Sequence, residues 1–195
     1  MKHLLRKFNK ILDYCFNYFE DTSLTFDNQR VVIHDSEYLL CRAVVPDVAE
    51  MLRLQKLVYM DDNSWDETVF ESELRNEKNK LYLIMRQNDR LVAFIGASFN
   101  QKVRDVHISN VAVDPDFQNR GLGQFLIQTM IKCARFNEYS SLSLETRLSN
   151  VRAQKLYSTI GFKNIGLKKS YYQSNHEDAV DMRLSIKNKK ESVNE

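Results

Sequence analysis

The residues best suited to bind a ligand lie in the middle of the chain, between a predicted strand and a predicted helix. The segment reads Gln118-Asn119-Arg120-Gly121-Leu122-Gly123. Glycine lets the backbone approach a ligand closely, and the first turn of a helix presents unpaired N–H groups at the positive end of the helix dipole. The segment is therefore expected to bind an anion, and a phosphate or pyrophosphate suits it.

The spacing of the glycines excludes two common phosphate-binding motifs. The dinucleotide fingerprint G-x-G-x-x-G needs a small residue at position 126, where Leu126 stands, and the P-loop sequence G-x-x-x-x-G-K-[ST] is absent. What remains is Q-x-x-G-x-G after a strand that ends in V-A-V-D-P. A glycine pair alone often only opens a helix, so the interpretation depends on the strand and helix around it.

These two flanking elements have clear patterns. Residues 106–113 are β-branched and alternating, which predicts a strand, and Pro115 ends it. After the glycines, apolar residues recur at helical spacing and polar residues occupy the opposite side. The apolar positions are Phe125, Leu126, Met130, Cys133 and Ala134, and the polar ones are Gln128, Lys132 and Arg135.

The remaining pattern alternates strands and helices, which indicates an α/β or α+β fold around a mixed sheet. Expected strands cover residues 30–34 and 38–45 as a hairpin, 80–86, 91–99, 141–145, a segment starting at 161, and 179–186. Expected helices cover residues 4–19, the segment from Pro46 to Tyr59, residues 65–78 with Ser64 as a possible N-cap, and 150–160. The first of these could pack on the domain, or bind a membrane surface or a partner.

Composition limits the class of protein. With 195 residues and 43% hydrophobic content, the chain can form one domain with a real core. A net charge of +2 gives no field for nucleic acid, so no direct nucleic-acid partner is expected. No apolar run is long enough for a membrane span and no signal peptide is recognised, so a cytoplasmic protein is expected. A monomer or weak homodimer is expected as well.

The three cysteines do not indicate chemistry. Cys15, Cys41 and Cys133 are far apart and lack the spacing of metal ligands. They are expected to be reduced, mostly buried thiols, and no metal is expected. A catalytic cysteine is disfavoured because no neighbouring residue in sequence supplies a paired base.

An acidic segment follows the second expected helix region. Residues 61–77 contain seven acidic side chains and one basic side chain, Arg75. The segment could be a solvated face, or a negative lip that steers a basic substrate toward the site.

A longer pattern lies at residues 144–162, L-E-x-R-x-S-N-x-x-A-x-x-L-Y-x-x-x-G-F. It resembles the ribosomal-protein alanine N-acetyltransferases of the RimI type, within the GNAT superfamily. The segments 169–172 and 177–182 resemble the closing part of that family, and the glycine segment resembles its coenzyme-A pyrophosphate loop. The likeness covers residues 40–186, leaving residues 1–39 as an N-terminal extension (amphipathic helix and short strand) and 187–195 as a disordered polar tail.

The resemblance implies a GNAT fold, with a central mixed, mostly antiparallel twisted sheet flanked by helices. It implies transfer of the acetyl group of acetyl-CoA, without an acyl-enzyme, to the α-amine of a basic protein N-terminus. The implied acceptor is the N-terminal alanine of a small-subunit ribosomal protein. Asn63-Ser64 stand where the family has Phe-Pro before Trp65, close to the expected acceptor groove.

The reaction needs a base, an oxyanion donor and an acid, and each has a candidate. Glu145 could take a proton from an α-amine, directly or through water, and the resemblance implies the same role. Tyr157 could protonate the departing thiolate. His107 is a rival base or a structural histidine. Tyr171 and Tyr172 could line the acceptor groove or pack on the sheet.

The cofactor residues follow from the strand edge, the glycine segment and the resemblance. Backbone groups of Val111, Ala112 and Val113 are expected to hold the acetyl and pantetheine groups, with the Val113 N–H as oxyanion donor. The pyrophosphate is assigned to Gln118, Asn119, Arg120, Gly121, Leu122, Gly123 and Gln124. Asn150 matches the family's cofactor-binding asparagine, or is a plain helix N-cap.

Two other functions stay open. The same fold could acetylate a lysine side chain or a small amine, which asks more of the base because a lysine ammonium has a reference pKa of about 10.4. Alternatively the chain could bind coenzyme A without catalysis, and substitutions of Glu145 or Tyr157 would then change nothing.

Overall fold

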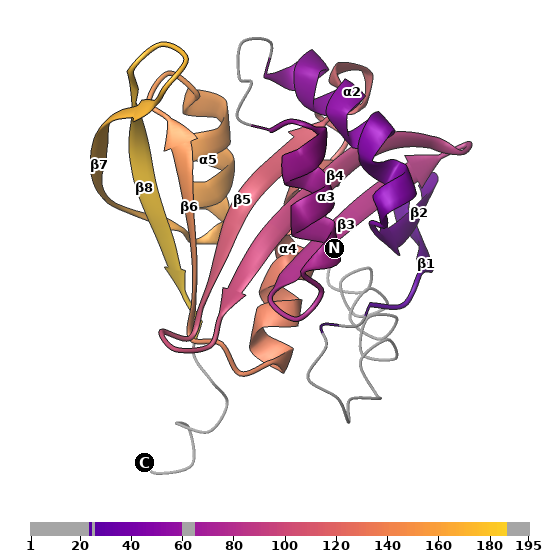
Figure 1. The fold of residues 1–195 in the computed structure, drawn as a ribbon, viewed down its shortest axis with the longest axis horizontal. Helices are drawn as coiled ribbons and strands as arrows, with labels where there is room; N and C mark the ends of the chain where they lie inside the picture. The colour runs from indigo at the N-terminus through magenta and orange to yellow at the C-terminus, as the bar shows by residue number, and fades with distance from the viewer. Residues whose placement is uncertain (1–23, 25, 60–64, 187–195) are drawn as a thin grey trace.

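One twisted sheet of eight strands forms the centre of the molecule (Figure 1). The computed structural model describes residues 24, 26–59 and 65–186, so the predicted helix over 4–19 and the tail over 187–195 lie outside the described residues. The strand order is β1-β2-β3-β4-β5-β6-β8-β7. The bounds are β1 Gln29–Ile33, β2 Ser36–Arg42, β3 Lys80–Gln87, β4 Arg90–Asn100, β5 Asp105–Val113, β6 Ser141–Arg147, β7 Lys163–Tyr172 and β8 Glu177–Ser185.

Neighbouring strands are antiparallel except for β5 and β6, which are parallel. The predicted mixed, mostly antiparallel sheet is thus confirmed. The first hairpin is also confirmed, with Val31 opposite Tyr38 and its turn at His34-Asp35. Since β1 and β2 pair into this sheet, the boundary expected between residues 39 and 40 falls within β2.

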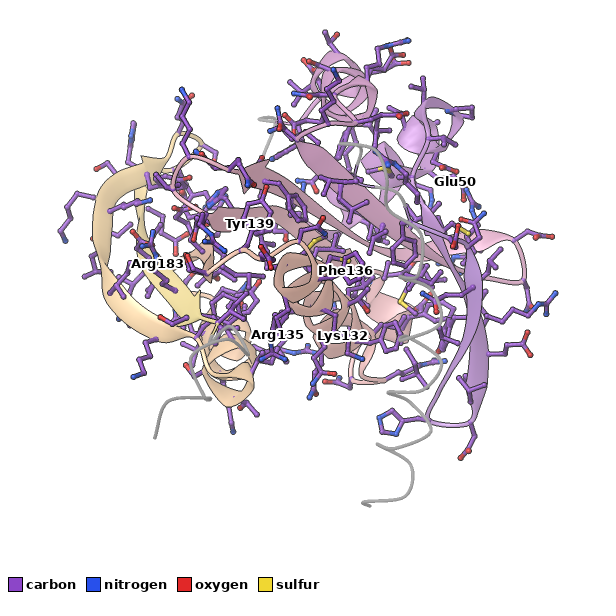
Figure 2. The ribbon with its side chains drawn as sticks, turned by 90° about the horizontal axis from the view of Figure 1, so that it is seen from below. Glu50, Lys132, Arg135, Phe136, Tyr139 and Arg183 are labelled. Atoms are coloured by element: carbon purple, nitrogen blue, oxygen red, sulfur yellow. The ribbon has the colours of Figure 1, made fainter. Side chains whose placement is uncertain are left out.

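Helices cover both faces of the sheet. Helices α2 (Val48–Val58) and α3 (Glu67–Arg75) pack on one face, while α4 (Leu122–Phe136) packs on the other, beside α5 (Val151–Ile160) (Figure 1). Two buried apolar clusters result, one under α2 and α3 and a larger one under α4. Figure 2 shows α4 nearly end-on, with Lys132 and Arg135 on the side that the amphipathic pattern predicts to be polar.

Helix α3 is shorter than predicted. Its N-cap is Asp66, whose Oδ1 accepts the Val69 N–H at 2.9 Å, so the helix begins at Glu67 rather than at Trp65. Ser64, the predicted cap, lies outside the described residues. Trp65 instead packs its ring against Phe70, with centroids 5.1 Å apart. The prediction was wrong because the capping carboxylate two residues later offers the first turn its missing acceptor.

A bulge in β5 opens the sheet. The register with β4 shifts between Gly96 and Ala97, which leaves Ser109 as the extra residue. Such bulges bend a strand and increase its twist. The parallel pairing with β6 runs from Asp105 opposite Ser141 to Ile108 opposite Leu144, and beyond this point the two strands separate (Figure 1).

Gly96 allows this distortion. A Cβ added there would lie 2.1 Å from a ring carbon of Tyr82, so only glycine lets this buried ring cross the strand. The Tyr82 hydroxyl then reaches Glu73 at 3.0 Å and Ser109 at 3.4 Å. The Tyr82 side chain of β3 thus crosses β4 and contacts the bulged residue Ser109 of β5.

Candidate active site

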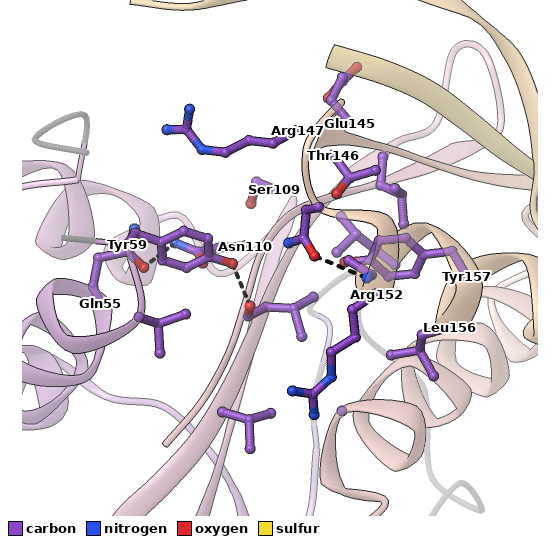
Figure 3. Close-up of a pocket in the computed structure, with 18 of the residues that line it drawn as sticks. Gln55, Tyr59, Ser109, Asn110, Glu145, Thr146, Arg147, Arg152, Leu156 and Tyr157 are labelled. Atoms are coloured by element: carbon purple, nitrogen blue, oxygen red, sulfur yellow. Dashed lines mark hydrogen bonds between the residues drawn. The ribbon is translucent and has the colours of Figure 1, made fainter. Parts of the chain in front are cut away.

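A cleft of about 1820 Å³ opens where β5 and β6 separate. Its walls come from β5, the segment 117–124, β6, α5 and the turn between β7 and β8. Figure 3 shows Glu145 from β6 and Tyr157 from α5 on one side, and Gln55 and Tyr59 from the α2 region on the other. This volume exceeds that of an ordinary small-ligand pocket, so the cleft has room for a long ligand and a second reactant.

The edge of β5 presents backbone groups to the cleft. The Val111 carbonyl accepts the Tyr59 hydroxyl at 2.6 Å (Figure 3). The Val113 carbonyl accepts Gln118 Nε2 at 3.1 Å. In an extended strand the N–H and C=O of one residue point to the same side, so the N–H groups of Val111 and Val113 face the cleft as well. Ala112 is fully buried in the cluster under α2 and α3, so the structure does not place it on the cleft.

The glycine segment forms the start of α4. Gly121 is the N-cap with φ +82°, a conformation that favours glycine. Asn119 precedes it with φ +63°. The N–H groups of the first turn, from Leu122 to Gln124, have no acceptor within a helix, and these residues line the cleft. The predicted anion site is thus open to the cleft.

The two glycines have different reasons to be glycine. At Gly121 the backbone conformation requires it, and a Cβ there would also lie 3.2 Å from His34 Nε2. At Gly123 a Cβ would be 3.6 Å from Val113 Cγ2, an ordinary contact. The protein's own packing therefore tolerates a side chain at Gly123, and the space it leaves is available to a ligand.

Two arginines lie near this loop, and the one that faces the cleft is not Arg120, which was predicted to bind the pyrophosphate. Arg120 is not among the cleft-lining residues; its guanidinium lies 4.8 Å from the Phe117 ring centroid and donates to the Asp116 carbonyl at 2.7 Å. Arg152 of α5 does line the cleft and donates to Gln118 Oε1 at 2.9 Å and Asn119 Oδ1 at 2.7 Å. Sequence reasoning missed Arg152, although its place two residues after Asn150 in the motif was a signal.

Glu145 sits at the cleft within a set of donors. Its side chain is only 8% exposed, and Lys168 of β7 pairs with Oε1. On Oε2 it meets the Tyr171 hydroxyl at 3.3 Å and His107 Nε2 at 3.3 Å. This carboxylate raises the pKa of Lys168, mainly through their hydrogen bond. Lys168 had no local sequence signal, since 22 residues of intervening chain must fold before it meets Glu145.

Tyr157 faces the cleft from α5 with its ring beside Phe162, at 5.9 Å between centroids. Burial raises the pKa of Tyr157 to about 12, with a smaller contribution from Tyr172. Its hydroxyl therefore stays protonated at neutral pH and can serve as a proton donor.

Asn150 caps α5, because its Oδ1 accepts the Ala153 N–H at 3.0 Å. The plain N-cap interpretation is thus confirmed as a fact of the fold. Asn150 also lines the cleft, so its role toward a cofactor stays a prediction.

The end of the cleft farthest from the glycine segment is lined by aromatic side chains. Arg147 lies 3.9 Å from the Tyr172 ring centroid and donates to Glu177 Oε2 at 3.1 Å. The buried Gln55 accepts the Asn110 amide at 3.0 Å from across the cleft floor. Tyr171 and Tyr172 both line the cleft, in agreement with the groove-lining alternative.

None of the acidic side chains within residues 65–77 lines the cleft, and Trp65 is the one residue of this range that does. Glu73 pairs with Lys80 at 2.9 Å, Glu71 pairs with Arg75 at 3.0 Å, and Asp66 caps α3. Asp61 and Asp62 lie outside the described residues. In the described part of the chain, no group of three or more His, Cys, Asp or Glu side chains could hold a metal ion.

A model of the acetyltransferase (GNAT) family matches residues 46–162. The chain belongs to the GNAT family. Members of this family use acetyl-CoA, and the chain is accordingly an acetyl-CoA-dependent N-acetyltransferase. The resemblance inferred from the motifs is confirmed.

Individual GNAT proteins refine the comparison. The ribosomal protein bS18-alanine N-acetyltransferase of Salmonella typhimurium is 37% identical over 125 residues, which cover 63% of this chain and 81% of the relative. The crystal structure of the ribosomal-protein-S18-alanine N-acetyltransferase from Escherichia coli has a TM-score of 0.69 and 27% identity, covering 76% of this chain and 94% of that one. The PaiA N-acetyltransferase of Thermoplasma acidophilum, in complex with coenzyme A, shares the fold with a TM-score of 0.64 and 11% identity, covering 76% and 99%.

Within the described residues, no helix has the length and apolar character needed to cross a membrane. Cys41 and Cys133 are free and buried, as predicted, and Cys15 lies outside the described residues. Burial raises the pKa of the Cys133 thiol to about 12, which makes it a poor nucleophile.

Proposed function

We propose that this GNAT enzyme acetylates the α-amine of a protein N-terminus, with the N-terminal alanine of a small-subunit ribosomal protein as its acceptor. The names of the similar proteins in Salmonella and Escherichia coli support this acceptor. The observation that carries the proposal is that one cleft holds an anion-binding helix start, a strand edge, a carboxylate and a protonated phenol.

The substrate acetyl-CoA is assigned to the glycine-loop end of this cleft. The N–H groups of Leu122, Gly123 and Gln124 suit its pyrophosphate, because anions are stabilised at a helix N-terminus. The N–H groups of Val111 and Val113 suit the amide and carbonyl groups of the pantetheine and acetyl parts, as in strand addition. The Val113 N–H is the donor proposed for the oxyanion.

The acid and base are then assigned to the side chains on β6 and α5. The acceptor arrives as an ammonium and must lose one proton, which Glu145 takes directly or through water. The amine nitrogen attacks the thioester carbonyl, the carbon–nitrogen bond forms and the carbon–sulfur bond breaks. After the attack the nitrogen loses a second proton, and Tyr157 gives one proton to the departing thiolate. These two protons cancel, so each turnover releases one proton to solvent.

The aromatic end of the cleft suits an extended peptide. Tyr59 on one side and Tyr172 on the other offer flat apolar surfaces beside the reacting amine. Tyr172 is held by Arg147, so the wall does not need to reorganise when a peptide enters. The first residues of the acceptor are therefore expected to bind in a fixed, extended path.

The test is release of free coenzyme-A thiol from acetyl-CoA, with mass spectrometry of two basic peptides. One peptide has a free N-terminal alanine and no lysine; the other has a blocked N-terminus and internal lysines. Acetylation of the first alone is expected. Modification of the second alone would replace the proposal with a lysine acetyltransferase, and no reaction with either would leave a small amine or a binding function.

A third peptide sharpens the specificity. It repeats the first with a bulky first residue in place of alanine. Equal rates for the two would contradict the assignment of an alanine acceptor while leaving the α-amine reaction in place.

A further inference from the structure

A chain of hydrogen bonds runs from the interior of the sheet to Glu145. Asp105 and His107 lie on β5, and Ser141 and Ser143 lie opposite them on β6. Ser141 and Ser143 each donate a hydroxyl to Asp105, the second at 2.5 Å. His107 Nδ1 is 3.1 Å from Ser143 Oγ, and His107 Nε2 is 3.3 Å from Glu145 Oε2.

The number of hydrogen-bond donors along this chain determines where the Ser143 hydroxyl hydrogen and the His107 ring hydrogen lie. A serine hydroxyl has one hydrogen, and the Ser143 hydrogen is given to Asp105. Ser143 Oγ can therefore only accept from the imidazole, so His107 carries a hydrogen on Nδ1. A neutral ring with Nδ1–H has a lone pair on Nε2, and that lone pair would face the Glu145 carboxylate.

His107 Nε2 and Glu145 Oε2 would then both be acceptors, and at 3.3 Å they repel each other unless a proton lies between them. From this count we propose that His107 and Glu145 act as one proton-sharing base, in which Asp105 and Ser143 fix the His107 tautomer so that the pair binds one proton strongly. This inference rests on the proposed α-amine reaction of the same site. His107 and Glu145 are then jointly the base, and Ser143 and Asp105 are positioning residues.

The burial of each member agrees with this order. Asp105 is 8% and Ser143 7% exposed, so the Asp105 end of the chain has little contact with solvent. The His107 side chain is 37% exposed and gives the proton a way out. The pair without its proton takes one from the acceptor ammonium through Glu145, shares it with His107 Nε2 and releases it to solvent, which accounts for the one proton liberated per turnover.

Other charged groups surround the pair, and they are the same in every variant proposed below. They are Lys168 and Tyr171 on β7, Asp181 on β8 at 3.5 Å from Lys168, Arg183 opposite Ser143, and Lys80, which donates to Ser98 opposite His107. Lys168 pairs with Glu145 Oε1, which leaves Glu145 Oε2 to face the imidazole.

The kinetic test is the pH dependence of kcat at saturating acceptor peptide, which reports ionisations within the complex. His107→Asn keeps a polar group beside Glu145 but cannot hold the shared proton. The acid limb of the profile is expected to move to lower pH, with a lower plateau. A structural role alone would lower the plateau and leave the limb in place.

Ser143→Ala provides the sharper variant because it does not touch Glu145. Without Ser143 the neutral ring is free to carry its hydrogen on Nε2 and donate to Glu145, so the pair no longer needs an extra proton. The acid limb should again move to lower pH. Ser141→Ala is the matched control, since Ser141 also donates to Asp105 but lies opposite Asp105 rather than opposite His107, and its acid limb should stay where it is in the wild type.

A measurement without turnover separates this inference from the proposed function. The nitrogen chemical shifts of the His107 ring report its tautomer directly in the intact enzyme. The neutral ring is expected as Nδ1–H in the wild type and as Nε2–H in Ser143→Ala. An Nε2–H ring in the wild type overturns the proposal, whether or not either peptide is acetylated; a failed peptide assay with the Nδ1–H ring overturns only the acceptor assignment.

Discussion

The two sides of the cleft present different chemical groups, backbone N–H groups on one side and side chains on the other. The glycine loop (residues 118–124) is one contiguous segment and offers backbone N–H groups. The C-terminal strands (β6, β8 and β7) offer side chains, and Glu145 meets Lys168 and Tyr171 only after two further elements have folded. Substitutions of the reacting side chains on the strand side should therefore change the rate, while substitutions in the loop should change binding and folding.

The largest effect is expected for Glu145→Gln. Glutamine keeps the shape but cannot accept a proton, so kcat should fall by about 10²–10⁴-fold. The dissociation constant of coenzyme A, measured by calorimetry, should stay unchanged because the glycine loop is untouched. Asp181→Asn is the control: it removes the other carboxylate beside Lys168 and should keep most of the activity. A loss of coenzyme-A affinity in Glu145→Gln would erase the contrast between the two sides.

A smaller loss of rate is expected for Tyr157→Phe, about 100-fold in kcat if the phenol protonates the thiolate. The Phe ring can keep the contact with Phe162, so unfolding by urea should be little changed. The raised pKa, about 12, keeps the hydroxyl protonated as pH rises. Hence wild-type kcat should show no alkaline loss from this group up to about pH 10. A decline there that disappears in Tyr157→Phe would contradict the burial of the phenol.

The same contrast explains what the sequence predicts well. The loop was found from its residues because the strand, the turn and the glycines are adjacent in the chain, and Gly121 has the positive φ that such a turn needs. Helix α4 and the hairpins followed from periodicity, since each buries one face against the sheet.

Contacts between distant segments could not be predicted. The Ser109 bulge depends on Tyr82 crossing Gly96 from the neighbouring strand, and nothing local to β5 marks it. His107 was judged a lone histidine because Ser143 and Glu145 become its neighbours only through parallel pairing. The predicted start of α3 was wrong for a more local reason, because the Asp66 side chain caps the helix.

Within the loop, the two glycines should respond differently to alanine. Gly121→Ala is expected to cost about 1–2 kcal/mol in the free energy of unfolding, because φ is +82°. Gly123→Ala should leave that free energy unchanged or raise it by up to about 1 kcal/mol, since alanine favours helix and its Cβ makes an ordinary contact.

Both variants should weaken coenzyme-A binding, one through a distorted loop and the other through a methyl group in the ligand's space. Urea unfolding and calorimetry on the two proteins measure these effects separately. Full affinity in a well-folded Gly123→Ala would show that the ligand does not approach this turn.

The smallest effect concerns Glu177, which ties the β8 end of the strand side to the start of α5. Hydrogen bonds from Ser149, with help from Arg147, hold the pKa of Glu177 at about 2. A lowered pKa stabilises the fold above the ordinary glutamate range, and this stabilisation is lost as pH falls toward 2. Glu177→Gln should therefore be less stable than the wild type at neutral pH, by about 1 kcal/mol, and the stabilities of the two proteins should converge in acid.

Glu37→Gln, which breaks an exposed pair with Arg30, is the control and should differ little from the wild type at any pH, because exposed pairs contribute little. If Glu177→Gln kept its deficit in acid, the contact would act through shape rather than charge, and the strand side would be joined to α5 by packing alone.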